Sequence, residues 1–425
     1  IPAADTWLNL ATGKYIINER TIPEKDIFSY TAQGRPWHST QWFILAVFYI
    51  FYSIFGKSGI YLLRTAFLLT TFGFIFAMCR VRSLNPLISV ICIIISAFIA
   101  QPYYYFDIRA YLVSYVFTAI YLFLLERRRI QNKPFPWWLL PLINCIWVNS
   151  HSGFIMGPGI IFIYFLDELI TEKDKKKSFY LLKIFSFTFL SCFLNPYGYK
   201  LFLQTFIVGQ SYGFMEKFLV EWNHPDLSGQ HLAFTFFWIV STFFIMFTIR
   251  KASLRDIILW GIFSYMAFKA VRHITLFCIV IVPVFIKHLE LIFADRLNFT
   301  AAIENFINTG TYIKITILII CFLIFFRTGF LIVTEDFSME KEMFPYYCVE
   351  FLRSNNLPGR LYNPYEWGGY IMWTMYPEKL VFCDGRATVV YTEEICRESY
   401  FSMAGQDFSV FDTCNINFVL CNKIN

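Results

Sequence analysis

Charged residues are scarce in this 425-residue sequence: they make up 16% of it, whereas about 25% is usual for a soluble domain. Hydrophobic residues reach 57% and aromatic residues 21%. The apolar residues gather in runs of roughly 16–22, the length that a helix needs to cross about 30 Å of hydrocarbon. A soluble enzyme, a nucleic-acid binder and a disordered scaffold are therefore excluded. So is a transmembrane barrel, because its strands would alternate apolar and polar residues.

Motifs of several enzyme classes are also missing. There is no P-loop, HExxH or GxSxG pattern, so ATP use, zinc proteolysis and triad hydrolysis have no motif support. None of the eleven cysteines forms a CxxC pair or has metal-ligand spacing. The chain opens without Met on a polar segment, and we expect a further span upstream of it.

The apolar runs predict ten membrane-spanning helices, separated by Pro, Gly and charge clusters. The run at 41–55 is short and rich in aromatic residues, which favours a helix lying along the membrane surface. The predicted fold is a membrane all-α bundle, a polytopic arrangement of about ten spans. These cover residues 59–79, 86–101, 110–126, 136–149, 153–170, 179–194, 231–249, 254–270, 273–288 and 313–333.

Lys and Arg are unevenly shared between the loops. The loops after the first, third, fifth and seventh spans hold thirteen of them, and the alternate loops hold five. Because cytoplasmic loops attract Lys and Arg, the basic loops are expected inside. Residues 1–40, the alternate loops and the tail from 334 are then expected outside. This topology alone explains the basic loops, which indicate no nucleic acid.

Ionisable residues of the outward loops are the candidate functional residues, because such groups are expensive near a bilayer. Lys269 and Arg272 lie about one helical turn apart with no acid nearby in sequence, which favours anion binding. Glu221 and Asp226 are as well explained as solvated loop acids. The remaining candidates also have ordinary explanations: a local ion pair for Asp107 with Arg109, a cap for Asp26, and a satisfied loop histidine for His151.

An acid beside cations at the membrane boundary suits group transfer from a phospholipid-like donor. The carboxylate would take the proton of an acceptor hydroxyl, and the cations would hold the leaving phosphate. A base opposite the leaving group is the arrangement that inverting displacement at a sugar carbon needs.

The first outward segment resembles that of a bacterial membrane-protein family with the approximate pattern DPDTWWHLATG…IP…DPFSYT…GRPW. Members of this family resemble glycosyltransferases of the C-type (GT-C) fold, similar to the dolichyl-phosphate-mannose and aminoarabinose transferases. The matching segments are 5–13, 22–23, 26–31 and 34–37. Further matches are Arg109 with Tyr111, 147–149 with 151–154, 195–198, Glu221-Trp222 with Pro225-Asp226, Arg272-His273, 367–370 and Asp384-Gly385-Arg386.

The resemblance implies a transferase of the bacterial cytoplasmic membrane. It would move a sugar from a polyprenyl-phosphate-linked donor, held among the membrane lipids, to an acceptor on the outer face, with inversion. Asp5 becomes the candidate catalytic base. The candidate substrate-binding residues are Asp107, Arg109, His151, Glu221, Asp226, Lys269, Arg272 and His273.

One departure from the family pattern keeps other functions open. Position 3 is Ala where the pattern has a second Asp, which weakens a site for a divalent cation (Mg or Mn) without excluding it. It also favours, as an alternative, a non-catalytic subunit of an envelope complex. A lipid or solute transporter is a third alternative, although the chain shows no internal repeat of the kind that transporters have.

The tail changes character, with more charge and shorter apolar runs. Strand-like segments at 359–363, 379–385 and 418–423 alternate with helix-like segments at 345–355, 366–376 and 392–403, which predicts a small α/β domain outside the membrane. Asp384-Gly385-Arg386 follows a strand, and a plain turn with a surface ion pair is favoured over a ligand site. The predicted parts are 1–58, the first loop with its interfacial helix; 59–333, the transmembrane domain; and 334–425, the α/β domain.

Overall fold

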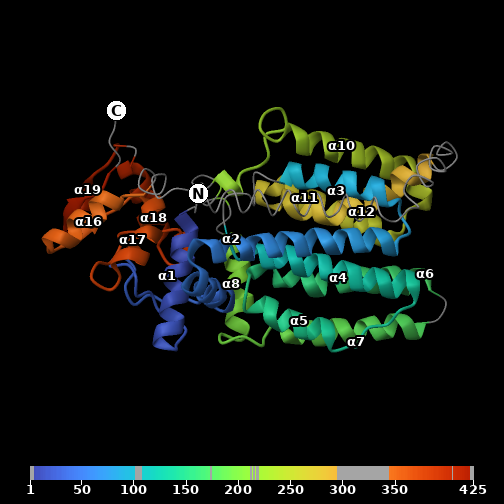
Figure 1. Ribbon diagram of the computed structural model, residues 1–425, viewed down its shortest axis with the longest axis horizontal. Coiled ribbons are helices and arrows are strands. Elements are labelled where there is room, and N and C mark those ends of the chain that lie inside the picture. Colours follow the sequence, from blue (N-terminus) through green and yellow to red (C-terminus); the bar gives the residue numbers. More distant parts are fainter. Residues whose placement is uncertain are drawn as a thin grey trace.

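The structure is a computed structural model that describes residues 4–100, 108–172, 175–210, 213, 216, 220–293, 344–403 and 405–421. Within these ranges the chain is mostly helical, with one two-stranded sheet. Figure 1 shows a long bundle of roughly aligned helices and, at one end of it, a smaller part formed by the N-terminal helix and the tail.

The bundle accounts for most of the predicted spans. Nine of the ten predicted segments fall on its helices, and the tenth, 313–333, lies outside the described residues. The helices are α2 (Trp42–Val81), α3 (Pro86–Ala100), α4 (Tyr111–Gln131), α5 (Leu139–Val148), α6 (Met156–Thr171), α7 (Lys175–Ser191), α8 (Tyr199–Gln210), α10 (Leu232–Phe247), α11 (Leu254–Lys269) and α12 (Ile274–Phe293). Short 3-10 turns are η2 (Ser152–Ile155), η3 (Val220–Trp222), η4 (Ile249–Lys251) and η5 (Val271–His273).

Three helical segments of the described chain are long and apolar enough to cross a membrane, at 42–81, 152–171 and 271–293. Helices α3, α5 and α10 are apolar but shorter. The described residues therefore support a membrane protein, whereas the full set of ten crossings and their orientation stay predictions.

Helix α2 is broken where the sequence predicts a change from surface helix to span. Gly56 has φ 59° and ψ −148°, which no helical residue adopts and which a glycine reaches at little cost. Its two parts, residues 42–55 and 57–81, therefore point in different directions, as the turn of α2 in Figure 1 shows. The break lies within three residues of the boundary at 59.

Residues predicted as the start of an outward loop form a helix instead, α1 (Ala4–Glu19). It packs between the first part of α2 and the tail helix α17 (Gly368–Met375). Trp7 is 2% exposed, and its ring makes edge contacts with those of Tyr52 and Tyr370, at centroid distances of 6.3 and 5.7 Å. One face of α1 is thus buried against the bundle and the tail together.

The tail agrees in part with its predicted strands. Strands β1 (Arg360–Tyr362) and β2 (Ile416–Val419) pair in parallel, but 379–385 contributes only an isolated bridge between Val381 and Ser29. The predicted strand at 379–385 is therefore wrong as a sheet member. All three predicted helical segments are found. The tail helices are α16 (Tyr346–Asn355), α17, α18 (Glu393–Met403) and α19 (Ser409–Thr413), with 3-10 turns η6 (Tyr365–Trp367) and η7 (Ala387–Val389).

The connection between α1 and α2, residues 20–41, joins the tail through hydrogen bonds. Tyr30 Oη donates to the carbonyl of Leu361 at 2.8 Å, and Thr31 Oγ1 donates to that of Phe382 at 2.5 Å. This connection pairs with the segment 379–385, which the sequence predicts as a strand. The N-terminal and C-terminal parts thus pack as neighbours, although the sequence analysis assigned them to separate domains. The predicted domain boundaries themselves stay predictions.

Gly13 allows α1 to approach α2 closely, so a larger residue should loosen the fold. A Cβ built at Gly13 would lie 2.1 Å from the carbonyl oxygen of Leu45. We expect Gly13→Ala to destabilise the protein by about 1–3 kcal/mol, because the backbone must move. Thermal unfolding in detergent checks this. Gly73→Ala is the matched control, since nothing described lies within 4 Å of a Cβ at that position of α2; equal effects would contradict the proposed contact.

Candidate functional site

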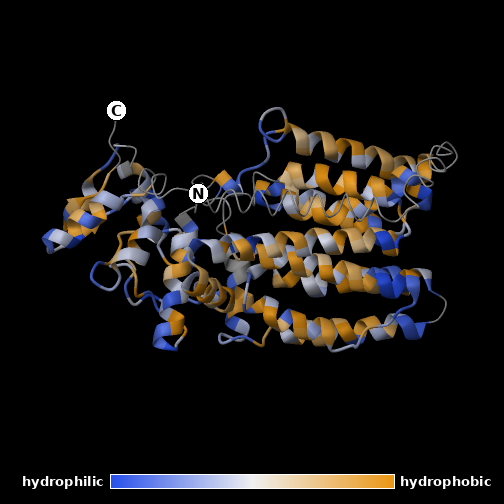
Figure 2. Cartoon of the chain, viewed as in Figure 1, coloured by the Kyte–Doolittle hydropathy of each residue, from blue (hydrophilic) through white to orange (hydrophobic). Residues whose placement is uncertain are grey.

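Ionisable side chains gather at the two ends of the bundle. Arg109 stands just before α4, and Glu126 lies 17 residues further along the chain, which corresponds to about 25 Å of helix. Figure 2 shows hydrophilic residues concentrated at the bundle end opposite the tail. The structure thus separates the predicted functional residues from the basic loops, and which end faces the cytoplasm stays a prediction.

At the end next to the tail, four of the predicted site residues form one ionic cluster, here called the tail-side cluster. Arg109 Nη2 lies 2.9 Å from Asp5 Oδ2, and Arg109 Nη1 lies 2.5 Å from Glu221 Oε2. Arg272 Nη1 lies 3.3 Å from Glu221 Oε1. The four side chains are 27–35% exposed, so the cluster is partly accessible from solvent.

The four residues come from segments far apart in the sequence. Asp5 lies in the first turn of α1, where an acid is favoured by the helix dipole. Glu221 and Arg272 lie in the short turns η3 and η5, which are tied together by a hydrogen bond from Val271 N to Asn223 O at 3.0 Å. The Arg272 guanidinium also lies 4.6 Å from the centre of the Trp222 ring.

Glu221 is held ionised by its neighbours. Burial alone would raise its pKa, but the guanidinium groups of Arg272 and Arg109 outweigh burial and keep the pKa below the ordinary value for Glu. This shared carboxylate therefore links the two arginines at any pH near neutrality.

His151 belongs to the same end and is fixed by a chain of hydrogen bonds. Its Nδ1 accepts from Gly153 N at 3.1 Å and lies 2.7 Å from Ser114 Oγ, which accepts from Trp147 Nε1 at 2.7 Å. Because Nδ1 is an acceptor, the ring proton sits on Nε2 and Ser114 donates to Nδ1. Glycine is needed at 153 because a Cβ there would lie 2.5 Å from Ser114 Oγ.

The charge state of His151 agrees with this assignment. Burial, with the positive charges of Arg272 and His273 nearby, lowers its pKa to about 3. The ring is therefore neutral at physiological pH and offers one donor, Nε2–H. Among the members of the tail-side cluster, Arg272 is the one whose charge contributes to this lowered pKa.

The other predicted residues are Asp107, Asp226, Lys269 and His273. Asp107 lies outside the described residues. Asp226 lies in an exposed turn, where it accepts from the N and Oγ of Ser228, both at 3.1 Å. Lys269 ends α11, three residues before Arg272. His273 Nδ1 lies 3.1 Å from the carbonyl oxygen of Met266, so this ring nitrogen is hydrogen-bonded to the last turns of α11, seven residues earlier in the chain.

The Asp384-Gly385-Arg386 turn differs from the prediction of a surface ion pair. Asp384 is 0% and Arg386 6% exposed, and Arg386 Nη1 also lies 2.5 Å from Oδ1 of Asp26 in the α1–α2 connection. The Arg386 guanidinium lies 4.6 Å from the ring centre of Trp37. The surface assignment is wrong because that connection folds over the turn. Asp26, predicted as a cap, also accepts from the backbone N of Ser29 at 3.1 Å.

A small apolar cleft of about 20 Å³ lies close to the Asp5–Arg109 ion pair. Its lining includes Thr6 and Ile108, the chain neighbours of that pair, together with Trp7, Lys57, Tyr61 and Arg64. Among the described residues, Trp7 Nε1 and Tyr61 Oη have no hydrogen-bond partner. The cleft between α1 and α2 therefore combines apolar walls with polar groups able to donate.

The described residues contain no group of three or more His, Cys, Asp or Glu side chains placed to hold a metal ion. Asp5 and Glu221 share Arg109 instead.

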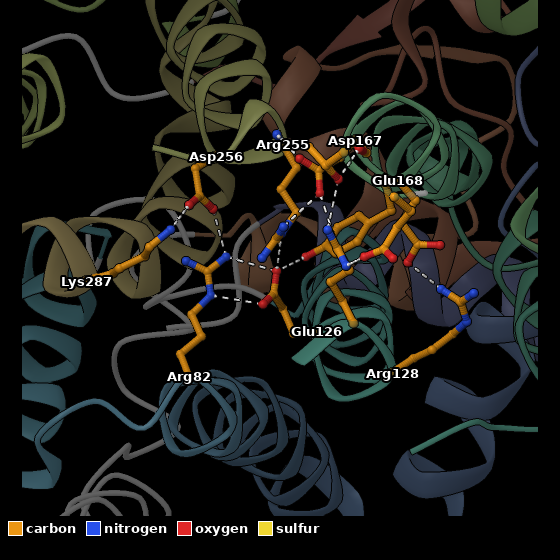
Figure 3. A network of polar contacts seen from close by, with 12 residues as sticks. Arg82, Glu126, Arg128, Asp167, Glu168, Arg255, Asp256 and Lys287 are labelled. Carbon is orange, nitrogen blue, oxygen red and sulfur yellow. Dashed lines mark hydrogen bonds and ion pairs between the residues drawn. The ribbon is translucent and has the colours of Figure 1, made fainter. Parts of the chain in front are cut away.

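At the opposite end, the sequence analysis missed a buried ionic network, shown in Figure 3. Arg82 Nη2 lies 3.0 Å from Glu126 Oε1 and 2.9 Å from Asp256 Oδ1. Arg255 Nε lies 2.9 Å from Glu126 Oε1, and its Nη1 lies 2.8 Å from Asp167 Oδ2. Further pairs are Lys287 with Asp256 and Arg128 with Glu168.

The expected enrichment of Lys and Arg in cytoplasmic loops accounts for the arginines of this network. It does not account for the acids that they contact. Glu126, Asp167 and Asp256 are 0% exposed and lie near the ends of predicted spans. A buried acid in such a position costs free energy unless it is paired with a cation. The presence of these three acids within apolar runs could therefore have indicated a buried ionic network. The partners, in contrast, lie on other helices and could not be assigned from spacing.

Removing Arg82 should be costly, because it would leave Glu126 and Asp256 buried with too little positive charge. We expect Arg82→Met to destabilise the protein by about 3–5 kcal/mol. Arg250→Met, at an exposed position of a neighbouring basic loop, should have little effect. Thermal unfolding of both variants in detergent compares them, and a small loss for Arg82→Met would contradict a structural role of the network.

The ion pairs of Glu221 with Arg109 and Arg272 should make the stability of the protein depend on pH. Because the pKa of Glu221 is lowered in the folded state, its stabilisation is full above the ordinary Glu pKa and is lost as the pH falls through the lowered value. Since the side chain is one-third exposed, the contribution is at most about 1 kcal/mol. The melting temperatures of wild type and Glu221→Gln should converge in acid, whereas Glu378→Gln, an exposed acid, should show no such convergence. Parallel curves would refute the linkage.

Comparison with models of known protein families gives no match, and comparison with curated proteins gives none either. The family resemblance therefore depends on the sequence motifs alone. The arrangement of the tail-side cluster is the independent observation from which a function can be argued.

Proposed function

We propose that the chain is an inverting membrane glycosyltransferase of the GT-C type, which takes its sugar from a polyprenyl-phosphate donor. The observation that carries this proposal is the tail-side cluster, in which one carboxylate is linked through Arg109 and Glu221 to a second arginine. Sequence reasoning selected these residues from four distant segments, and they lie together. Their partial exposure fits a site that admits a substrate.

In the proposed reaction Asp5 is the general base. It takes the proton of an acceptor hydroxyl while that oxygen attacks the anomeric carbon of the sugar. The bond from this carbon to the phosphate oxygen breaks, and its electron pair leaves with the polyprenyl phosphate. Arg272 stabilises the phosphate charge, while Arg109 orients Asp5 and contributes positive charge between the two groups. His151 supplies one neutral donor at Nε2 to the sugar or the phosphate.

The apolar cleft between α1 and α2 is lined by the chain neighbours of Asp5 and Arg109, but its volume of about 20 Å³ is that of a water-sized group and not of a lipid chain. A lipid-linked donor would therefore approach the tail-side cluster from the bundle surface. The proposed enzyme works in a bacterial cytoplasmic membrane with its tail on the outer side. The lipid-linked donor and the acceptor would then meet at the boundary between bundle and tail.

A second function is favoured by one observation, the direct contact of Arg109 with Asp5. This ion pair neutralises the candidate base and could serve only to tie α1 to α4. The chain would then be a non-catalytic GT-C-like subunit of an envelope complex.

Replacing the base separates the two functions. We expect Asp5→Asn to lower sugar transfer by at least about 100-fold, because general base catalysis contributes factors of this size. The purified protein in detergent is given a panel of polyprenyl-phosphate sugars with an extract of envelope acceptors, and released polyprenyl phosphate is measured. Asp407→Asn is the control, since this exposed acid lies in a turn of the tail.

Two results would overturn the proposal. One is a wild-type chain that releases no polyprenyl phosphate from any donor of the panel. The other is an Asp5→Asn variant that transfers at the wild-type rate. The tether function predicts instead that Asp5→Asn lowers the melting temperature and that neither protein transfers sugar.

A further inference from the structure

The Asp384-Gly385-Arg386 turn of the tail lies directly against the carboxylate of Asp5. A Cβ built at Gly385 would lie 2.6 Å from Asp5 Oδ1, closer than real side-chain contacts allow, and 3.8 Å from Leu8 Cδ1. Arg109 contacts the other oxygen, Oδ2, at 2.9 Å. The carboxylate is therefore held between a bundle residue on one oxygen and the tail turn on the other.

Glycine is needed at 385 for space. Gly385 is not among the glycines with a left-handed φ, so its backbone conformation is open to other residues. The obstacle to a side chain is thus the Asp5 carboxylate itself. A substitution at 385 consequently reports on Asp5 rather than on the geometry of the turn.

A buried ionic cluster holds the turn in place. Arg386 donates from Nε and Nη2 to both oxygens of Asp384, at 2.8 and 2.6 Å, and from Nη1 to Asp26 at 2.5 Å. Tyr391 Oη donates to Asp384 Oδ2 at 2.5 Å. Because these groups are at most 6% exposed, breaking any one pair would leave a buried charge without compensation.

Close backbone packing fixes the other side of the turn. A Cβ at Gly368, the first residue of α17, would lie 2.2 Å from the carbonyl oxygen of Cys383. Asn363 Nδ2 donates to the same carbonyl at 2.8 Å. The turn is therefore rigid relative to the tail, and it cannot retreat from Asp5 without moving α17.

We infer that Gly385 is a positioning residue for Asp5, and that the tail turn forms one wall of the proposed catalytic site. The ionic cluster of Asp26, Asp384 and Arg386 holds the turn against Asp5 Oδ1, so that this oxygen keeps a fixed direction toward the acceptor. The catalytic part of this inference rests on the proposed function; the contact between Gly385 and Asp5 does not.

A double-mutant cycle on the full chain tests the contact without any activity. We expect Gly385→Ala to lower the melting temperature in the wild-type background, because the added methyl displaces the carboxylate. In the Asp5→Ala background the same substitution should cost little, since the carboxylate that it meets is gone. Gly261→Ala in α11 is the matched control, because nothing described lies within 4 Å of a Cβ there. An equal cost of Gly385→Ala in both backgrounds would overturn the inference.

Steady-state kinetics test the positioning. Misplacing a catalytic group by about 1 Å can cost about 100-fold in rate, so Gly385→Ala should lower kcat by at least about 10-fold while the donor KM stays within about twofold. The acid limb of the rate–pH profile should also shift, which loss of folded protein alone would not produce. An unchanged kcat and profile, with the stability coupling present, would overturn the positioning role. If the Asp5→Asn result overturns the proposed function, the double-mutant cycle still tests the contact between Gly385 and Asp5, because it measures stability and not activity.

Discussion

The ion pair between Asp5 and Arg109 is the point at which the N-terminal helix, the tail and the bundle meet. Its two side chains are 28% and 29% exposed, which makes the pair a weak source of stability, because water screens such pairs. The contacts that hold α1 in place are apolar and steric: the buried ring of Trp7 and the close approach at Gly13. An ion pair that is not needed to hold the fold together can exchange partners with a substrate at little cost, which is what a site requires of its charges.

The two ends of the bundle use the same residue types under different constraints. In the network around Arg82, each acid is fully buried and several carry two cationic partners, so any unpaired charge would be exposed to a low dielectric. Such a network favours one arrangement of α2, α4, α6, α11 and α12. The tail-side cluster has equal numbers of acids and arginines but is about one-third exposed, so a phosphate could compete for its guanidinium groups. Burial, more than composition, separates a structural network from a candidate site.

Sequence reasoning predicted the helices well because hydrophobic runs bounded by Gly, Pro and charge carry a strong local signal, as at Gly56. It failed where the answer depends on distant partners. The segment around Val381 has the composition of a strand, but its neighbour is Ser29, 352 positions away, so a bridge forms in place of a sheet. The members of the candidate site were selected from their residue types and from the family resemblance, whereas their pairing through Arg109 could not be predicted. Asp26 and Arg386 show the limit most clearly, since each has an ordinary local explanation and the burial of the pair exists only after folding.

The contact at Gly385 bears on how the tail should be understood. The tail shares hydrogen bonds with the α1–α2 connection, packs on α1 through Tyr370, and meets the candidate base directly. If it were a separate module that only captured acceptors, its removal would leave Asp5 in place; the packing instead makes the position of Asp5 depend on the tail. The turn is itself held by the buried ion pairs of Arg386 with Asp26 and Asp384. Under the proposed function, the tail would therefore orient the base before an acceptor arrives, and the acceptor would dock against a site whose wall is already in place.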